Sequence, residues 1–319
     1  MKVFLLSSFY LTLCCSSFAE PIQRIAFGSC VKQYLEQPIW SAINAFEPEL
    51  WIWMGDNIYG DSEDPAILTA KYAQQKAIPG YANLRENCPI IGTWDDHDYG
   101  KNNAGKEYPS KKASQKAFLD FLDEPAESLR RQQKGVYWSH LYGDSKRAVQ
   151  VILLDVRYFR DIPGTENADV LGKKQWSWLE ATLEQSDADL ILIVSGIQVL
   201  QEDHRYEKWA NFPEARKRLL DLASLETNGR VVFLSGDRHI GEMASLRHGS
   251  AASELVEVTS SSLTHSWTSY PGEPNRHRIG EVYSENNFGT AEIDWKNRSI
   301  RFAIRDIDGS AQRSLKLDF

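Results

Sequence analysis

The chain has 319 residues, of which 42% are hydrophobic and 25% charged, so it can bury a large core and carries no sign of disorder. Its formal net charge of −8 argues against broad nucleic-acid binding, which depends on neutralising phosphates with Lys and Arg. The same charge does not exclude a small phosphorylated molecule that reaches a metal-containing pocket.

The chain opens with a predicted secretory signal, residues 1–19. An apolar run after one basic residue ends in small residues before a cleavage point at Ala19. The alternative is a lipoprotein signal at Cys14 or Cys15, which we disfavour because the preceding Leu13 is large. No later stretch of about 18 apolar residues follows, so we expect a secreted or periplasmic mature protein without a transmembrane segment.

The predicted mature chain, residues 20–319, contains no linker, repeat or low-complexity tract, and we expect a single domain that is a monomer. It retains two cysteines, Cys30 and Cys88. In an oxidising compartment two cysteines favour a disulfide. The alternative is that Cys30 stays free as a thiolate metal ligand, and the motifs below favour this alternative.

Apolar runs predict buried strands and 3.6-residue periodicity predicts helices through most of the chain. The tail differs, because short alternating strands are separated by turns. Together these patterns predict an α/β fold in which two sheets pack face to face, with helices on the outer faces. The elements are, in chain order, a strand at 24–29, a helix at 39–46, strands at 50–54 and 89–94, a helix at 114–122, a hairpin of 136–142 and 148–154, a helix at 175–183, a strand at 190–195, a helix at 213–225, and strands at 230–235, 255–259, 290–295, 300–305 and 314–317.

Residues of the kind that bind metals follow four of these strands. Cys30 closes a Gly-Ser-Cys segment, and Asp56 opens Gly-Asp-Asn-Ile-Tyr, which ends at Tyr59. Strand ends meet at one edge of a sheet, so such residues can converge on one pocket. A buried carboxylate such as Asp56 must be paired, hydrogen-bonded or metal-bound. Tyr59 is either a phenolate ligand suited to ferric iron or an ordinary packed aromatic residue.

The densest acidic cluster is Trp-Asp-Asp-His-Asp, which ends at Asp98. If the strand continues through it, alternation sends Asp95 and His97 one way and Asp96 and Asp98 the other. One pair would then face a metal while the other orients it. The alternative is a solvated turn, which the apolar run before the cluster disfavours.

Later motifs supply further candidate ligands. Asn102 and Asn103 can offer amide oxygens to a hard cation such as Ca²⁺. Asp237 and His239 follow a buried strand, and their spacing places both side chains on one face, which favours a ligand role.

Arg157 also follows a buried strand, two residues after Asp155. A guanidinium in a pocket suits bidentate contact with a phosphoryl oxygen. The alternative is a structural ion pair with Asp155 or Asp161, and the sequence does not choose between them.

The order of these motifs resembles the PhoD-like family, also called alkaline phosphatase D, across residues 25–294. This family belongs to the calcineurin-like metallophosphoesterases. The resemblance implies a four-layer α/β/β/α fold with mixed sheets and hydrolysis of phosphomonoesters or phosphodiesters. The first strand follows the signal directly, so we expect this chain to lack the N-terminal domain of some relatives.

The resemblance also implies a ferric ion with calcium alongside, although Zn, Mn or Mg would suit the same residue types. Relatives that load iron commonly use a twin-arginine signal, which is missing here, so metal identity stays open. The implied roles are Cys30, Asp56, Tyr59 and His239 for iron, Asp56 or Asp237 shared between ions, Asp95 or Asp96 with Asn103 for calcium, Arg157 and Asn103 for the substrate phosphate, and His97 or Arg157 for charge developing on the phosphoryl group.

We therefore expect metal-assisted phosphoryl transfer to water. One rival is a metal-independent glycosidase that uses two carboxylates near Asp95. The other is a non-catalytic binding protein that metals merely stabilise. The sequence does not decide between monoesters and diesters, a choice we expect to depend on a loop with Asp203, His204, Tyr206 and Trp209.

Overall fold

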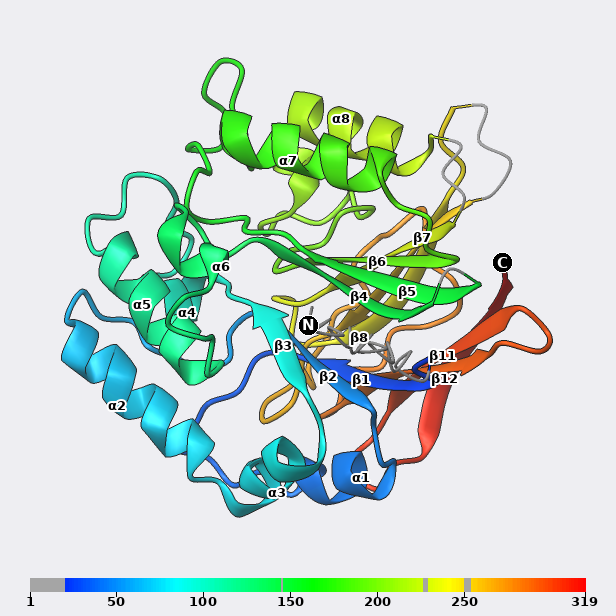
Figure 1. The fold of residues 1–319 in the computed structure, drawn as a ribbon, viewed down its shortest axis with the longest axis horizontal. Helices are drawn as coiled ribbons and strands as arrows, with labels where there is room; N and C mark the ends of the chain where they lie inside the picture. The colour runs from blue at the N-terminus through cyan, green and yellow to red at the C-terminus, as the bar shows by residue number, and fades with distance from the viewer. Residues whose placement is uncertain (1–20, 145, 226–228, 250–253) are drawn as a thin grey trace, which may run out of the picture.

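A computed structural model describes residues 21–144, 146–225, 229–249 and 254–319 of the chain. The predicted signal, with Cys14 and Cys15, lies outside the described residues. Two six-stranded sheets lie against each other in the middle of the molecule, with helices beyond both of them (Figure 1).

The first sheet combines the start of the chain with its end. Its order is β12-β11-β10-β1-β2-β3, in which β1, β2 and β3 are parallel and β10 pairs antiparallel with β1. The tail strands thus extend the N-terminal sheet. The strands are β1 (Arg24–Gly28), β2 (Leu50–Met54), β3 (Ile90–Thr93), β10 (Phe288–Asp294), β11 (Ser299–Arg305) and β12 (Ala311–Asp318).

The second sheet has the order β4-β5-β6-β7-β9-β8. Its inner strands β5, β6, β7 and β9 are parallel, while β4 and β8 pair antiparallel at the two edges. Both sheets are therefore mixed, as the family resemblance implies. The strands are β4 (Trp138–Asp144), β5 (Arg147–Leu153), β6 (Leu190–Ser195), β7 (Arg230–Ser235), β8 (Gly241–Leu246) and β9 (Leu255–Ser260).

Three apolar clusters separate four layers. One lies between the sheets, where residues such as Phe27 and Ile52 of the first sheet share a cluster with Leu192 of the second. A second cluster joins the outer face of the first sheet to its helices, and a third does the same for the second sheet. In β2 every residue is buried, because both faces of the strand are covered. The predicted α/β class with two mixed sheets is confirmed, and the three clusters agree with the expected four layers.

The helices divide between the outer faces. Helices α7 and α8 cover the second sheet, and α1 and α3 lie beyond the first, with α2 nearby (Figure 1). No helix among the described residues has the length and apolar character to cross a membrane. The helices are α1 (Ile39–Ala45), α2 (Pro65–Lys76), α3 (Pro79–Asn87), α4 (Asp96–Tyr99), α5 (Lys111–Phe121), α6 (Leu129–Gln132), α7 (Gly172–Glu184), α8 (Pro213–Ala223) and the 3-10 turn η1 (Trp209–Asn211).

The predicted strands are confirmed to within a few residues, and the predicted hairpin is β4 with β5, where Gly143 and Asp144 pair inside β4. Strand β8 and helices α2, α3 and α6 have no counterpart in the prediction. Helix α2 begins where the Asp64 carboxylate accepts a hydrogen bond from the backbone of Ala66, with Pro65 in the first turn.

Candidate metal centre

A candidate metal ligand lies two residues beyond the end of each of four strands. Cys30, Asp56, Asp95 and Asp237 are each the second residue beyond the end of β1, β2, β3 and β7, respectively. These four strands belong to the parallel parts of the two sheets, so their carboxyl ends open toward one region. The predicted convergence of strand ends is therefore found.

Two glycines allow these strand ends to approach closely. A Cβ on Gly55 would lie 2.5 Å from the Asp95 Cβ, and a Cβ on Gly196 would lie 2.5 Å from Asp95 Oδ1. Gly55 also has a φ of 97°, which side-chain-bearing residues rarely adopt. Glycine is thus required at position 55 by the close approach of Asp95 and by the backbone conformation, while Asp56 supplies the candidate ligand.

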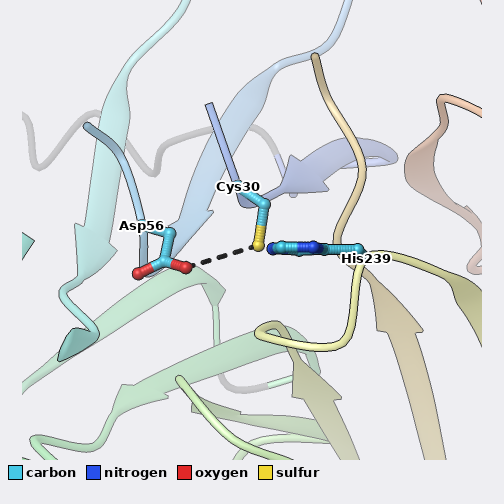
Figure 2. A group of neighbouring side chains, drawn as sticks. All are labelled: Cys30, Asp56 and His239. Carbon is cyan, nitrogen blue, oxygen red and sulfur yellow. Dashed lines mark hydrogen bonds between the residues drawn. The ribbon is translucent and has the colours of Figure 1, made fainter. Parts of the chain in front are cut away.

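Cys30, Asp56 and His239 form the first of three potential ligand groups, in which all ligand atoms lie within 4.8 Å of one another. The Cys30 thiol points between the other two side chains, and its Sγ lies 3.6 Å from Asp56 Oδ2 (Figure 2). Cys30 and Cys88 are both free, so the alternative of a disulfide is wrong. The thiol is available as a ligand.

Tyr59 lies beside this group. Its hydroxyl is 2.8 Å from His239 Nε2 and 2.9 Å from His265 Nε2, and its ring stacks on His97 with centroids 4.0 Å apart. Sequence reasoning did not assign His265 to the site. The only signal was its position shortly after the buried strand β9.

Two further groups adjoin the first. One consists of Asp56, Asp96 and His97, and the other of Asp95, Asp96 and Asp237. Asp56 belongs to two groups and Asp96 to two, so the three potential sites form a continuous chain. Such sharing suits neighbouring cations with bridging carboxylates.

The predicted alternation through the acidic cluster is wrong, because the strand ends at Thr93 and the chain turns into helix α4. Asp95 caps this helix, and Asp98 accepts a hydrogen bond of 2.7 Å from the Asp95 backbone in return. Asp98 also accepts one of 2.6 Å from Asn57 Nδ2, away from the ligand groups. The helical turn instead leaves Asp96 and His97 in the same group.

Five of the predicted site residues have left-handed backbone conformations. Their φ values run from 49° to 71°, a region that costs residues with a side chain about 1 kcal/mol or more each. Such conformations cluster at functional sites, where the surrounding fold imposes them. The five are Cys30, Asp56, Asn103, Asp237 and His239.

The acidic groups repel one another. Burial, and then the neighbouring Asp96, raise the pKa of Asp56 well above its usual value. Burial and Asp95 do the same to the pKa of Asp237, and burial and Asp56 raise the pKa of the Cys30 thiol. Ionising all these groups together requires positive charge among them.

The histidines differ from one another. Burial opposes protonation of His97, but its Nδ1 lies 2.7 Å from Asp61 Oδ1, and this contact raises the pKa of His97. Burial lowers the pKa of His239 to about 4 and that of His265 to about 3. His239 is therefore neutral at pH 7, the form in which histidine binds metal.

The residues present fit metal ions. Asp95 Oδ2 is buried and has no hydrogen-bond partner among the described residues, although Oδ1 of the same carboxylate is paired with Arg157. A buried carboxylate oxygen without a partner is costly. Thiol, imidazole and phenol donors around Asp56 suit a transition metal, whereas the carboxylates around Asp96 suit a hard cation.

Arg157 is fully buried and its charge is already balanced. Its Nε lies 2.6 Å from Asp95 Oδ1, and another guanidinium nitrogen lies 2.7 Å from Glu207. Asp155 is not its partner through the guanidinium. Instead, the Asp155 carboxylate accepts hydrogen bonds from the backbone of Arg157 and from Trp94. Arg157 thus bridges a candidate ligand and the loop that carries Glu207.

A cavity of about 520 Å³ opens over the ligand groups. Among the residues expected to select substrate, Tyr206 lines it, whereas Trp209 is buried and donates to Ser195. Arg157 does not line it. The lining residues are Asp56, His97, Asn102, Asn103, Arg205, Tyr206, Glu207, Asp237, Arg238, His239 and Trp267.

The cavity places both Asn102 and Asn103 at the site. The Asn103 backbone donates a hydrogen bond of 2.6 Å to Asp96 Oδ2, and Arg160 donates to the Asn103 carbonyl. Asp203, by contrast, pairs with Arg276.

These features define a two-sheet α/β/β/α protein with an acidic, ligand-rich pocket at its strand ends. The family model for "PhoD-like phosphatase" matches residues 14–303. The chain therefore belongs to the PhoD-like phosphatase family.

Individual relatives agree with this assignment. The chain is 24% identical over 281 residues to alkaline phosphatase D of Bacillus subtilis (strain 168), a match that covers 71% of this chain and 47% of that protein. The chain thus spans about half the length of this curated relative.

Solved structures share the fold. "Structure of PhoD" superposes with a TM-score of 0.79 at 17% identity, covering 94% of this chain and 70% of that one. GAP50, described as the anchor in the inner membrane complex of Plasmodium, superposes with a TM-score of 0.58 at 14% identity, covering 94% and 90%. At these identities the likeness shows the fold alone.

Proposed function

We propose that this protein is a metal-dependent phosphoesterase that hydrolyses phosphomonoesters, phosphodiesters or both. The observation that carries the proposal is the chain of three linked ligand groups, which lies at the floor of an open cavity. Family membership supports the same reaction class.

We assign the first ligand group, with Tyr59, to a transition metal, for which Fe³⁺ fits a thiolate, phenolate and imidazole set. We assign Asp95, Asp96, Asp237 and the Asn103 amide to a hard cation such as Ca²⁺. Asp56 belongs to the first group and also meets Asp96 in the second, so it is the residue that we propose to be shared between the two ions. Bound metal ions would lower the pKa of water and neutralise phosphate oxygens.

His97 is the proposed general acid. It lines the cavity, and Asp61 raises its pKa and holds Nδ1, which leaves Nε2 as the nitrogen able to donate a proton to the leaving oxygen. Arg157 would act through Asp95, whose carboxylate it holds. Direct contact between Arg157 and substrate would require Glu207 to release it.

We further propose that residues 20–319 fold as one domain, which the shared core between the two sheets supports. The sequence of residues 1–19 supports export through a cleavable signal. N-terminal sequencing of the exported protein should then begin at Glu20.

The function is tested by elemental analysis of the purified protein together with hydrolysis of an aryl phosphate and a bis-aryl phosphate, with and without chelator. Bound transition metal and chelator-sensitive turnover are expected. The ratio of the two rates would separate monoesterase from diesterase. Metal-free protein that iron and calcium do not activate would refute the proposal, and chelator-resistant turnover of a glycoside would establish the glycosidase alternative.

Asp56→Asn is the matching variant. It should reduce both metal content and activity by more than the roughly 10- to 100-fold that loss of an outer partner costs. Asp187→Asn is the control, because Asp187 is exposed and remote from the cavity lining. Equal turnover in the two variants would rule out Asp56 as a ligand.

A further inference from the structure

The ligand groups account for the floor of the cavity but not for its rim. Four side chains line the cavity above the ligands and have no role in the proposed chemistry, namely Arg205, Tyr206, Arg238 and Trp267. We call these four residues the aromatic rim. Both rings are half-buried, so part of each ring surface is open.

The side chains of the rim contact one another in a defined arrangement. The rings of Tyr206 and Trp267 meet edge to face, with centroids 5.7 Å apart and an interplanar angle of 85°. The Arg238 guanidinium lies over both rings, at 4.3 Å from the Tyr206 centroid and 5.6 Å from that of Trp267. Glu273 holds this guanidinium through a contact of 2.6 Å. The rings are therefore fixed before any ligand arrives.

The rim is tied to the segments that carry the candidate ligands. Arg238 stands between Asp237 and His239 in the chain. The Trp267 backbone donates a hydrogen bond of 2.8 Å to the His239 carbonyl. The rings consequently keep a set position relative to the point where an ester phosphate would bind.

The opposite end of the rim is anchored as well. Tyr206 precedes Glu207, whose carboxylate lies 2.7 Å from Arg157 and 2.6 Å from Arg160. Arg157 in turn contacts Asp95. Each ring is thus connected to a candidate metal ligand, Trp267 through its hydrogen bond to His239 and Tyr206 through Glu207 and Arg157.

Arg205 gives the mouth a positive charge. It is exposed, lies 5.1 Å from the Tyr206 ring centroid and donates a hydrogen bond of 3.1 Å to the Tyr206 hydroxyl, and among the described residues no acidic side chain forms an ion pair with it. A guanidinium in that position suits an electron-rich ring, or a second anionic group that such a ring carries.

We propose that the aromatic rim binds the alcohol half of the ester and selects phosphoesters whose leaving group carries a planar ring. Simple aryl or benzyl esters and nucleotides share this chemistry. The inference rests on the proposed phosphoesterase function and narrows its substrate class. Stacking on fixed aromatic side chains is tolerant of ring identity, so the preference should extend across planar rings.

The test compares benzyl phosphate with cyclohexylmethyl phosphate. Both release a primary alcohol of similar size and nearly the same acidity, so the chemical step is closely matched and the main difference is the flat aromatic ring. For the wild-type protein, kcat/KM for benzyl phosphate should exceed that for cyclohexylmethyl phosphate by about fivefold or more, the range expected for one stacked ring. A ratio near one in the wild type would overturn the inference.

Trp267→Leu is the decisive variant, because its backbone hydrogen bond to His239 does not depend on the side chain. In this variant the ratio of kcat/KM for benzyl phosphate to kcat/KM for cyclohexylmethyl phosphate, which we call the benzyl preference, should fall close to one. The value of kcat/KM for cyclohexylmethyl phosphate should be retained. Trp267→Phe should restore most of the preference, and Tyr206→Leu should reduce it independently. Equal losses on both substrates in Trp267→Leu would overturn the inference and assign Trp267 to holding the metal centre.

Trp178→Leu is the matched control. Trp178 lies on α7 against Tyr137, outside the cavity lining, and its loss should leave the ratio unchanged. A second pair, adenosine 5′-phosphate against ribose 5-phosphate, identifies the source of the ring. A benzyl preference with a nucleotide preference assigns nucleotides, whereas a benzyl preference alone assigns simple aromatic esters.

The proposed function and this inference fail in different ways. No hydrolysis of benzyl phosphate, of cyclohexylmethyl phosphate, of the aryl phosphate or of the bis-aryl phosphate by metal-loaded wild type would refute the phosphoesterase itself. Hydrolysis of the first two at equal kcat/KM would leave the phosphoesterase standing and remove the rim as a selective subsite.

Discussion

The hydroxyl of Tyr59 lies 2.9 Å from Nε2 of His265, a residue 206 positions later in the chain, while the same hydroxyl lies 2.8 Å from His239. Tyr59 therefore stands between two imidazoles. If the phenol binds metal, His265 is the partner that can hold its oxygen in place.

We expect His265→Ala to weaken metal binding by roughly tenfold or more, the usual cost of losing an outer partner of a ligand. Metal affinity, measured by competition with a coloured chelator, checks this. His248→Ala is the control, since His248 pairs with Asp221 on the surface at α8. Unchanged affinity in His265→Ala would show that Tyr59 does not need this contact.

Arg157→Leu should destabilise the fold by about 3–5 kcal/mol, because it leaves the buried carboxylate of Asp95 without its guanidinium partner and leaves Glu207 with Arg160 alone. Urea unfolding of the metal-free protein at pH 7 measures this. In the double variant Arg157→Leu/Glu207→Gln, part of the loss should be recovered, because the two sites share one interaction. A loss below about 1 kcal/mol, the usual range for a surface pair, would mean that the ion pairs contribute little.

Glu257, which belongs to none of the ligand groups, should make the folding stability depend on pH. It is fully buried and accepts backbone hydrogen bonds from Val199 and Leu200, and burial raises its pKa to about 6. A raised carboxyl pKa means that the folded state holds the proton more tightly than the unfolded state. The stability from this group is complete below pH 4.5 and is lost as pH rises through 6.

The variant Glu257→Gln should lack this loss. Its unfolding free energy relative to wild type should rise by about 2 kcal/mol between pH 4 and pH 7, since each pKa unit corresponds to about 1.4 kcal/mol. Urea melts across this range provide the measurement. Parallel stability curves for the two proteins would contradict the raised pKa.

Cys30 and Cys88 should both be alkylated in protein unfolded without reductant, because both thiols are free. In the folded protein both should react slowly, since Cys30 is 0% and Cys88 5% exposed. Peptide mass spectrometry distinguishes the modified sites. A peptide pair linked through the two sulfurs would overturn the assignment of free thiols.

Most strands of the two sheets could be predicted because a buried strand is a short run of apolar residues that is visible in the local sequence. The unbroken apolar runs at 50–54, 190–195 and 230–235 match β2, β6 and β7 residue for residue. Helix α2 was not predicted because its buried residues, Leu68, Tyr72 and Gln75, are too few to form a clear apolar stripe in the sequence.

The candidate site was predictable to the extent that its residues follow strands. Cys30 and Asp56 fall into this category. Glu207 does not, and His265 lies five residues beyond the end of β9, so the place of both residues depends on contacts with chain segments far away in the sequence. The direction of Asp96 could not be read either, since helix α4 replaces the extended chain on which alternation relies.

The left-handed backbone at Cys30, Asp56, Asn103, Asp237 and His239 also bears on efforts to make this protein more robust. At each of these positions glycine would relieve the backbone cost. Replacing Asp56 or Asp237 with glycine would in addition remove a repelling charge. A screen that rewards heat resistance alone would therefore favour inactive variants, so library selection for thermostability must include metal retention as a second criterion.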